Sequence, residues 1–63
     1  MIRDRRKAER YSQQELASRM GMGQSLYSQK ESGTIKWSAS ELKILVEMGL
    51  INKTEAKEIL WNQ

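Results

Sequence analysis

The chain has 63 residues with 11 Lys and Arg against 8 Asp and Glu, a formal net charge of +3, and no Cys, His or Pro. A chain this short forms one small domain, and without Cys or His it has no disulfide framework, no zinc site, and no His or Cys to serve as nucleophile or general base. It also lacks a calcium loop, paired carboxylates, a glycine-rich phosphate loop and a long apolar run, which argues against an enzyme, a metal or cofactor, a small-molecule ligand and a membrane-spanning segment.

Helix-forming residues dominate the composition, and positive charge gathers at the N-terminal end. β-branched residues are few and Pro is absent, so we predict an all-α fold, a compact bundle of about five short helices. Residues 1–10 hold five basic and two acidic side chains, whereas residues 38–63 hold three basic and four acidic ones. This asymmetry favours a polyanion partner. The alternative is a solvated helix face with i, i+4 pairs, such as Arg5 with Glu9.

The first helix is expected over residues 2–10, with little to anchor it. Ile2 is its one large apolar residue, and Ala8 is small. Its packing against the rest of the domain is therefore expected to be weak or shifted.

Two short helices joined by a tight turn, the layout of a helix-turn-helix, are predicted within residues 12–33. Ser12 is a good N-cap, and Glu15 three residues later completes a capping box. This helix runs to about Met20, and Gly21 supplies the left-handed turn that ends it. Its core-facing residues share one side of the helix: Leu16, Ala17 and Met20.

The second of these helices is expected from Gly23 or Gln24 to Ser32, with Gly33 closing it. Its outer face carries only uncharged hydrogen-bonding side chains, namely Gln24, Ser25, Ser28 and Gln29. A solvent-exposed face normally favours Lys and Glu, whereas uncharged donors and acceptors suit the edges of base pairs in the major groove of DNA. On such a face alone an ordinary polar surface would be the better interpretation, but framed by the blocks SQQELA, GMG and ESG the pattern favours base recognition.

This segment resembles the lambda-repressor-like helix-turn-helix family, which includes phage repressors, Cro proteins and XRE-type regulators. The resemblance lies in the blocks SQQELA, GMGQS and ESG, which keep the family spacing without a gap. It extends as a fold assignment over residues 2–48. It implies a sequence-specific DNA-binding transcriptional regulator, expected to be a repressor in the cytoplasm of a bacterium or phage-infected cell.

Recognition by such proteins divides into base reading and phosphate contact. The resemblance assigns base reading to Gln24, Ser25, Ser28 and Gln29. The candidates for phosphate contact are Gln13, Arg10, Arg19, Lys30 and Lys36. In the family, a Gln at the place of Gln13 also braces the first residue of the second helix. The resemblance therefore implies a contact between Gln13 and Gln24. A solvated role is an equal alternative for Arg19, and Arg6 either forms an ion pair inside the domain or contacts DNA.

Two positions depart from the family, which has buried aliphatic residues where this chain has Tyr27 and Lys30. We expect the ring of Tyr27 to fill the space and its hydroxyl to reach the surface. We expect the stem of Lys30 to pack while its ammonium lies near a phosphate.

A fourth helix is expected after the loop of residues 34–37. Ser38 or Ser40 provides its N-cap, and Ser38 with Glu41 repeats the capping-box pattern. Gly49 ends this helix. Its apolar face is expected to be core rather than part of a cofactor site: Leu42, Leu45, Val46 and Met48.

The last helix lies within residues 50–63, from an N-cap at Asn52, with Glu55 three residues later, to about Trp61. A helix this short needs packing to persist. Ile59 is expected to pack inward, while Leu60 and Trp61 are candidates for a contact with a second copy of the chain. A partly exposed tail is the alternative for Trp61.

One short helix reads only a few base pairs, so useful specificity requires two copies on a pseudo-palindromic site with half-sites about one helical turn apart. We therefore expect a homodimer on double-stranded DNA. The alternative is a protein-interaction module, such as an antitoxin or an accessory subunit, that keeps this fold with little DNA binding and uses the last helix as its partner surface.

Overall fold

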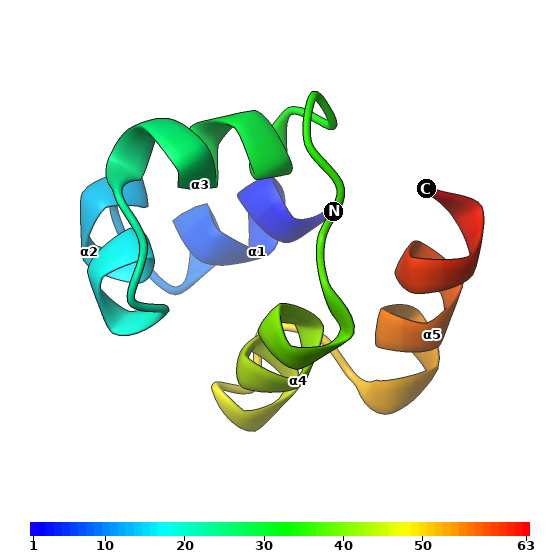
Figure 1. The fold of residues 1–63 in the computed structure, drawn as a ribbon. Coiled ribbons are helices and arrows are strands. Elements are labelled where there is room, and N and C mark those ends of the chain that lie inside the picture. Colours follow the sequence, from blue (N-terminus) through cyan, green and yellow to red (C-terminus); the bar gives the residue numbers. More distant parts are fainter.

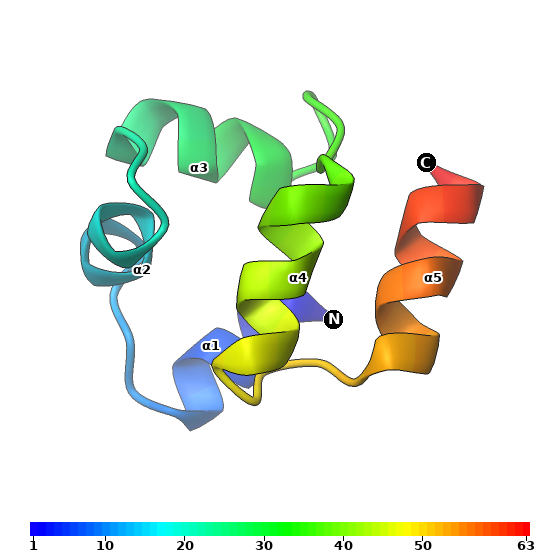
Figure 2. The ribbon, with the colours of Figure 1, turned by 60° about the horizontal axis from the view of Figure 1, so that its bottom comes forward.

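The computed structural model describes residues 1–63 as five helices without a strand (Figure 1), which confirms the predicted all-α bundle. The helices are α1 (Ile2–Ala8), α2 (Gln13–Arg19), α3 (Gln24–Glu31), α4 (Ala39–Glu47) and α5 (Lys53–Asn62). Figures 1 and 2 both place α5 beside α4, at the side of the molecule away from α2. None of the helices has the length and apolar character needed to cross a membrane.

Capping boxes set the starts of three helices, as the sequence predicts. Ser12 caps α2, Ser38 caps α4, and Asn52 caps α5. In each case the cap side chain accepts from the backbone N–H three residues later, at 3.0, 3.2 and 2.8 Å respectively. The Glu at that position accepts in return from the backbone N–H of the cap residue. Of the two serines considered for α4, the cap is therefore Ser38.

Glycines with positive φ follow the ends of α2, α3 and α4. Gly21 and Gly49 adopt φ values of 71° and 79°, which an L side chain disfavours and glycine tolerates. Helix α1 ends at Ala8, two residues before the predicted end. Arg10 takes φ 62° and the backbone N–H of Tyr11 donates to the carbonyl of Arg6, so the chain leaves the helix without a glycine.

The core lies between α2, α3 and α4 and is completed by Ile2 of α1 and by side chains from the loops before and after α4. Trp37, from the loop between α3 and α4, is buried and packs edge-on against Tyr27, with ring centroids 5.7 Å apart. Such a pair adds to the burial of both rings. The buried apolar residues are Ile2, Leu16, Ala17, Met20, Tyr27, Trp37, Leu42, Leu45, Leu50 and Ile51.

An ion pair, rather than apolar packing alone, attaches α1 to the C-terminal part of the chain. The guanidinium of Arg5 pairs with Glu55 of α5 and also donates to the carbonyl of Leu50 at 3.3 Å. The predicted alternative, a pair between Arg5 and Glu9, is wrong, because Arg5 points toward α5 instead of along its own helix. On α5 itself, Ile59 packs partly against the core as expected.

The expectation for Tyr27 is half right. Its ring fills the core and is fully buried, but its hydroxyl does not reach the surface and has no hydrogen-bond partner. Burial, together with the neighbouring carboxylate of Glu31, raises the pKa of Tyr27, so the phenol stays neutral. The prediction was wrong for the hydroxyl because the side chain points into the domain, where the hydroxyl lies near the buried pair of Arg6 and Glu31.

Replacement Tyr27→Phe is therefore expected to leave the free energy of unfolding unchanged or slightly higher. On folding, a buried hydroxyl without a partner gives up its hydrogen bonds to water and forms none within the protein. Its removal should therefore change the free energy of unfolding little. Urea denaturation followed by circular dichroism measures this. A loss of about 1 kcal/mol or more, the size of an ordinary hydrogen bond, would show instead that the hydroxyl donates to a partner in solution.

Candidate DNA-binding surface

The outer face of α3 carries the four side chains predicted to contact bases. Gln24, Ser25 and Gln29 are exposed and Ser28 is half-buried. None of the four side chains has a hydrogen-bond partner within the protein, although the carbonyl of Gln29 accepts from other residues. Their donors and acceptors are therefore free for a ligand.

The opposite face of α3 is held to α1 by a buried ion pair. Arg6 donates from Nε and Nη2 to the two carboxylate oxygens of Glu31, at 2.9 and 3.1 Å. The two side chains are only 8% and 3% exposed. The third donor of Arg6 reaches the carbonyl of Tyr11 at 2.8 Å. Of the two interpretations of Arg6, the structure shows the ion pair inside the domain.

Gln13, the first residue of α2, joins the same network. Its Nε2 donates to Oε1 of Glu31 at 3.1 Å, and no hydrogen bond connects it to Gln24. Glu31 therefore accepts from α1 and α2 while belonging to α3. Burial acts to raise the pKa of Glu31, but the hydrogen bonds from Arg6 and Gln13 outweigh burial and hold the pKa below its ordinary value. The carboxylate is thus charged at neutral pH and fixes three helices to one another.

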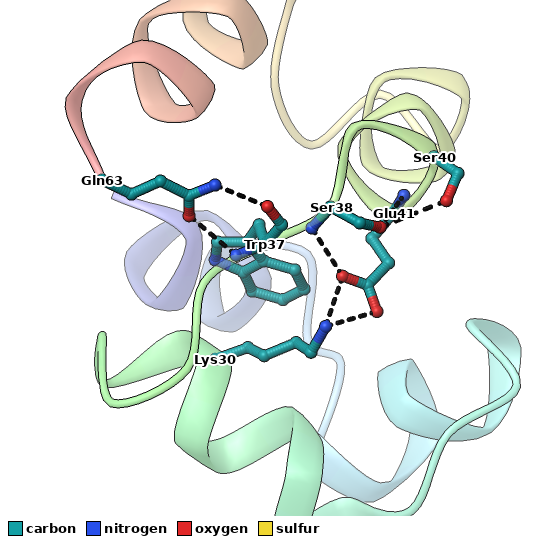
Figure 3. A network of polar contacts seen from close by, with 6 residues as sticks. All are labelled: Lys30, Trp37, Ser38, Ser40, Glu41 and Gln63. Carbon is teal, nitrogen blue, oxygen red and sulfur yellow. Dashed lines mark hydrogen bonds and ion pairs between the residues drawn. The ribbon is translucent and has the colours of Figure 1, made fainter.

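Lys30 lies in a second ion pair, at the buried edge of α3 (Figure 3). Its stem packs as expected, and the side chain is only 9% exposed. The ammonium was expected near a phosphate; instead it donates to both oxygens of Glu41, at 2.5 and 2.6 Å. Glu41 also accepts from the backbone N–H of Ser38 at 2.8 Å. Because this charge is already neutralised inside the domain, we leave Lys30 out of the phosphate contacts proposed below.

The other basic candidates are exposed and form no ion pair. Arg10 lies in the turn after α1, and Lys36 lies in the loop after α3. The guanidinium of Arg19 lies 5.1 Å from the ring centroid of Tyr11 and remains exposed. Three positive charges are thus available to an anionic ligand.

Acid is expected to destabilise this arrangement. Burial tends to raise the pKa of Glu41, but its hydrogen bonds from Lys30 and Ser38 lower it, as for Glu31. Since both pKa values lie below the 4.5 of an unperturbed Glu, the folded state binds fewer protons than the unfolded chain. The two carboxylates should therefore contribute fully to the free energy of unfolding near neutral pH. Their contribution should be lost as the pH falls through 4.5 and below.

Thermal denaturation at a series of pH values tests this. Glu41→Gln should make the acid-induced fall shallower, whereas Glu47→Gln, at an exposed position on the same helix, should keep the fall of the parent chain. Stability that rises between neutral and mildly acidic pH would contradict the expectation.

Two contributors escaped the sequence analysis. Glu31 belongs to the ESG block, but the pattern did not indicate that three helices share its carboxylate. Gln63, the residue after α5, bonds to the backbone of Trp37. A side-chain amide at that place gives no signal in hydrophobic periodicity or capping patterns, so only the tertiary structure reveals it.

Comparison with known protein families gives a match to a family model described as helix-turn-helix, over residues 2–48. The matched range covers α1 to α4 and is the range expected from the motif blocks. No curated protein and no solved structure matches the chain.

Proposed function

Because the chain belongs to the lambda-repressor-like helix-turn-helix family of DNA-binding regulators, we propose that it is a sequence-specific regulator that binds double-stranded DNA as a homodimer. The observation that carries this proposal is the outer face of α3, where exposed amides and hydroxyls have no partner in the protein. An ordinary solvent-exposed helix would have charged residues there.

In the proposed complex α3 lies in the major groove. Gln24 and Gln29 each carry an amide whose NH₂ group can donate to N7 of adenine while its oxygen accepts from the N6 amino group. Such a bidentate pair is worth about 1–3 kcal/mol of discrimination. Ser25 and Ser28 are shorter and act as donor or acceptor. The ion pairs on the opposite face of α3 support the proposal, because they hold the helix rigidly without occupying its outer face.

The proposed phosphate contacts are made by Gln13, Arg10, Arg19 and Lys36. The three charged residues are exposed and unpaired. Gln13 is half-buried and gives one amide hydrogen to Glu31, which leaves the second hydrogen of its NH₂ group for a phosphate oxygen. These contacts would place the protein on the duplex without reading its sequence.

The proposed contact between two copies lies on α5. Leu60 and Trp61 are 45% and 87% exposed, a large apolar surface for a small chain. A groove between α4 and α5 lies beside Leu60; it is lined by apolar Leu42, Val46 and Ala56 and rimmed by Lys43, Lys53, Lys57 and Glu47. Leu60 borders this groove, and the exposed Trp61 follows Leu60 in α5. An apolar groove next to an exposed aromatic residue suits the self-complementary surface that a two-fold symmetric contact requires.

Trp61→Ser is expected to weaken dimerisation while leaving the fold intact. A central aromatic anchor is worth about 2 kcal/mol or more at an interface, so the dimer dissociation constant should rise about thirtyfold. Sedimentation equilibrium of both proteins measures it. Because Trp61 is 87% exposed, the melting temperature at monomeric concentrations should not change. Identical dissociation constants for the two proteins would place the contact elsewhere.

Selection from a random duplex library with the purified protein, followed by sequencing, tests the function itself. A two-fold symmetric motif with half-sites about one turn apart is expected. Enrichment without a motif would remove sequence specificity from the proposal. A failure to enrich any duplex would favour the protein-interaction module, with the exposed apolar face of α5 as its partner surface.

A further inference from the structure

Gln63 is bound to the backbone of Trp37 through both ends of its amide (Figure 3). The N–H of Trp37 donates to Oε1 of Gln63 at 2.7 Å, and Nε2 of Gln63 donates to the carbonyl of Trp37 at 2.5 Å. Neither backbone group of Trp37 has another hydrogen-bond partner in the protein. Since Trp37 is 6% exposed and buried backbone groups require partners, Gln63 satisfies a need that no other residue meets.

The loop held by this contact runs from Thr34 to Trp37, between α3 and α4. At its start, the N–H groups of Thr34 and Ile35 both donate to the carbonyl of Gln29, at 2.9 and 3.1 Å. At its end, the ring of Trp37 packs on Tyr27 and its backbone is held by Gln63. Lys36 lies between these anchors and is the one residue of the loop whose own backbone makes no hydrogen bond.

The direction in which Lys36 points therefore depends on the peptide groups on either side of it. The anchor at Ile35 belongs to α3 itself. The anchor at Trp37 comes from the residue that follows α5, so the last helix and the loop beside the recognition face are joined by two hydrogen bonds.

We propose that Gln63 is a positioning residue for DNA binding: by holding the backbone of Trp37, it orients Lys36 toward a phosphate and ties α5 to the DNA-facing loop. The inference rests on the proposed function and deepens it. Gln63 itself touches no DNA in this arrangement and acts only through Lys36. The same helix carries Leu60 and Trp61, so a second copy seated on them would also stabilise this anchor.

A double-mutant cycle tests the inference with four proteins: the parent chain, Gln63→Met, Lys36→Ala and the double variant. Met keeps the length of the Gln side chain and removes both hydrogen-bonding ends. Binding to a mixed-sequence duplex is measured as a function of salt concentration. Lys36→Ala should reduce the magnitude of the salt slope by about one and weaken binding by up to about eightfold at 0.1 M salt, as expected for one lost phosphate contact.

Gln63→Met should change the slope and the affinity in the same direction, and it should have no further effect in the Lys36→Ala background. Its backbone amide signals for Lys36 and Trp37 in an NMR spectrum should shift, while those of α2 should not. The matched control is Asn62→Ala, because the Asn62 side chain bonds only within its own helix, to the carbonyl of Glu58 at 2.9 Å. Asn62→Ala should bind as the parent chain does.

A merely structural role for Gln63 would give a different result. Additive effects of Gln63→Met and Lys36→Ala, or parental binding by Gln63→Met, would overturn the positioning role while Lys36 remains a phosphate contact. If neither the parent chain nor any variant binds duplex DNA, the proposed function itself fails, and the positioning role fails with it.

Discussion

Replacement Glu31→Ala is expected to remove a large part of the free energy of unfolding. Removing one partner of a buried ion pair costs about 3–5 kcal/mol, because the remaining charge is left uncompensated. Domains gain only roughly 0.05–0.15 kcal/mol per residue, so a chain of 63 residues has about 3–9 kcal/mol in all, and the substitution removes a large part of it. In the variant, the guanidinium of Arg6 and the amide of Gln13 would both lose the carboxylate that they share.

Urea denaturation monitored by circular dichroism measures the loss. The matched control is Glu47→Ala, which removes an exposed carboxylate from α4 and should change the free energy of unfolding by no more than about 0.5 kcal/mol. The double variant Arg6→Met with Glu31→Leu removes both charges and fills similar volumes, so it should recover most of the loss. A cost below about 1 kcal/mol for Glu31→Ala, the level of an exposed ion pair, would contradict the expectation.

The same network explains how so small a core holds α3 in place. Leu16 and Ala17 of α2 pack against a face of α3 that offers only Tyr27 as a large apolar side chain. Fixed polar contacts on both sides of Tyr27 supply the rest: Glu31 holds α3 to α1 and α2, and Lys30 holds it to α4. The orientation of α3 therefore depends on these two ion pairs as well as on apolar packing.

Local signals in the sequence were sufficient for the helices but not for their pairing. Ser12, Ser38 and Asn52 act within three residues of themselves, so a capping box can be predicted without knowledge of the fold. The partner of Lys30 could not be predicted in this way, since any of the 8 acidic residues is a candidate until α4 is placed beside α3. The pair of Arg5 and Glu55 joins residues 50 positions apart. The expected pair of Arg5 with Glu9 was wrong because local spacing gives no information on such a distant partner.

The candidate site also has a part that local sequence patterns predict and a part that depends on tertiary packing. The outer face of α3 follows from helical periodicity alone, and the structure places its residues together and unpartnered. The burial of the Tyr27 hydroxyl and the contact of the Gln63 amide with the backbone of Trp37 depend on how distant segments of the chain pack, which periodicity does not describe. The contacts that the residues on the outer face of α3 make with DNA remain predictions.

Gln24→Ala and Gln29→Ala are expected to reduce the preference for the best duplex site without reducing binding to other duplexes. A bidentate amide contact to adenine is worth about 1–3 kcal/mol, so each variant should lose about fivefold to 150-fold in affinity for the selected site. Both side chains are exposed and unpartnered, and Ala is the best helix former, so α3 and the melting temperature should be unaffected. Competition binding with the selected site and a scrambled duplex measures the ratio.

Lys36→Ala is the contrasting variant, because a phosphate contact carries no sequence information. It should weaken binding to the selected and the scrambled duplex by the same factor and should leave their ratio unchanged. If Gln24→Ala, Gln29→Ala and Lys36→Ala all reduce both affinities equally, base reading does not reside on α3. Double-stranded DNA would then be held by charge alone, and the free amides and hydroxyls of this face would be better explained by a protein partner.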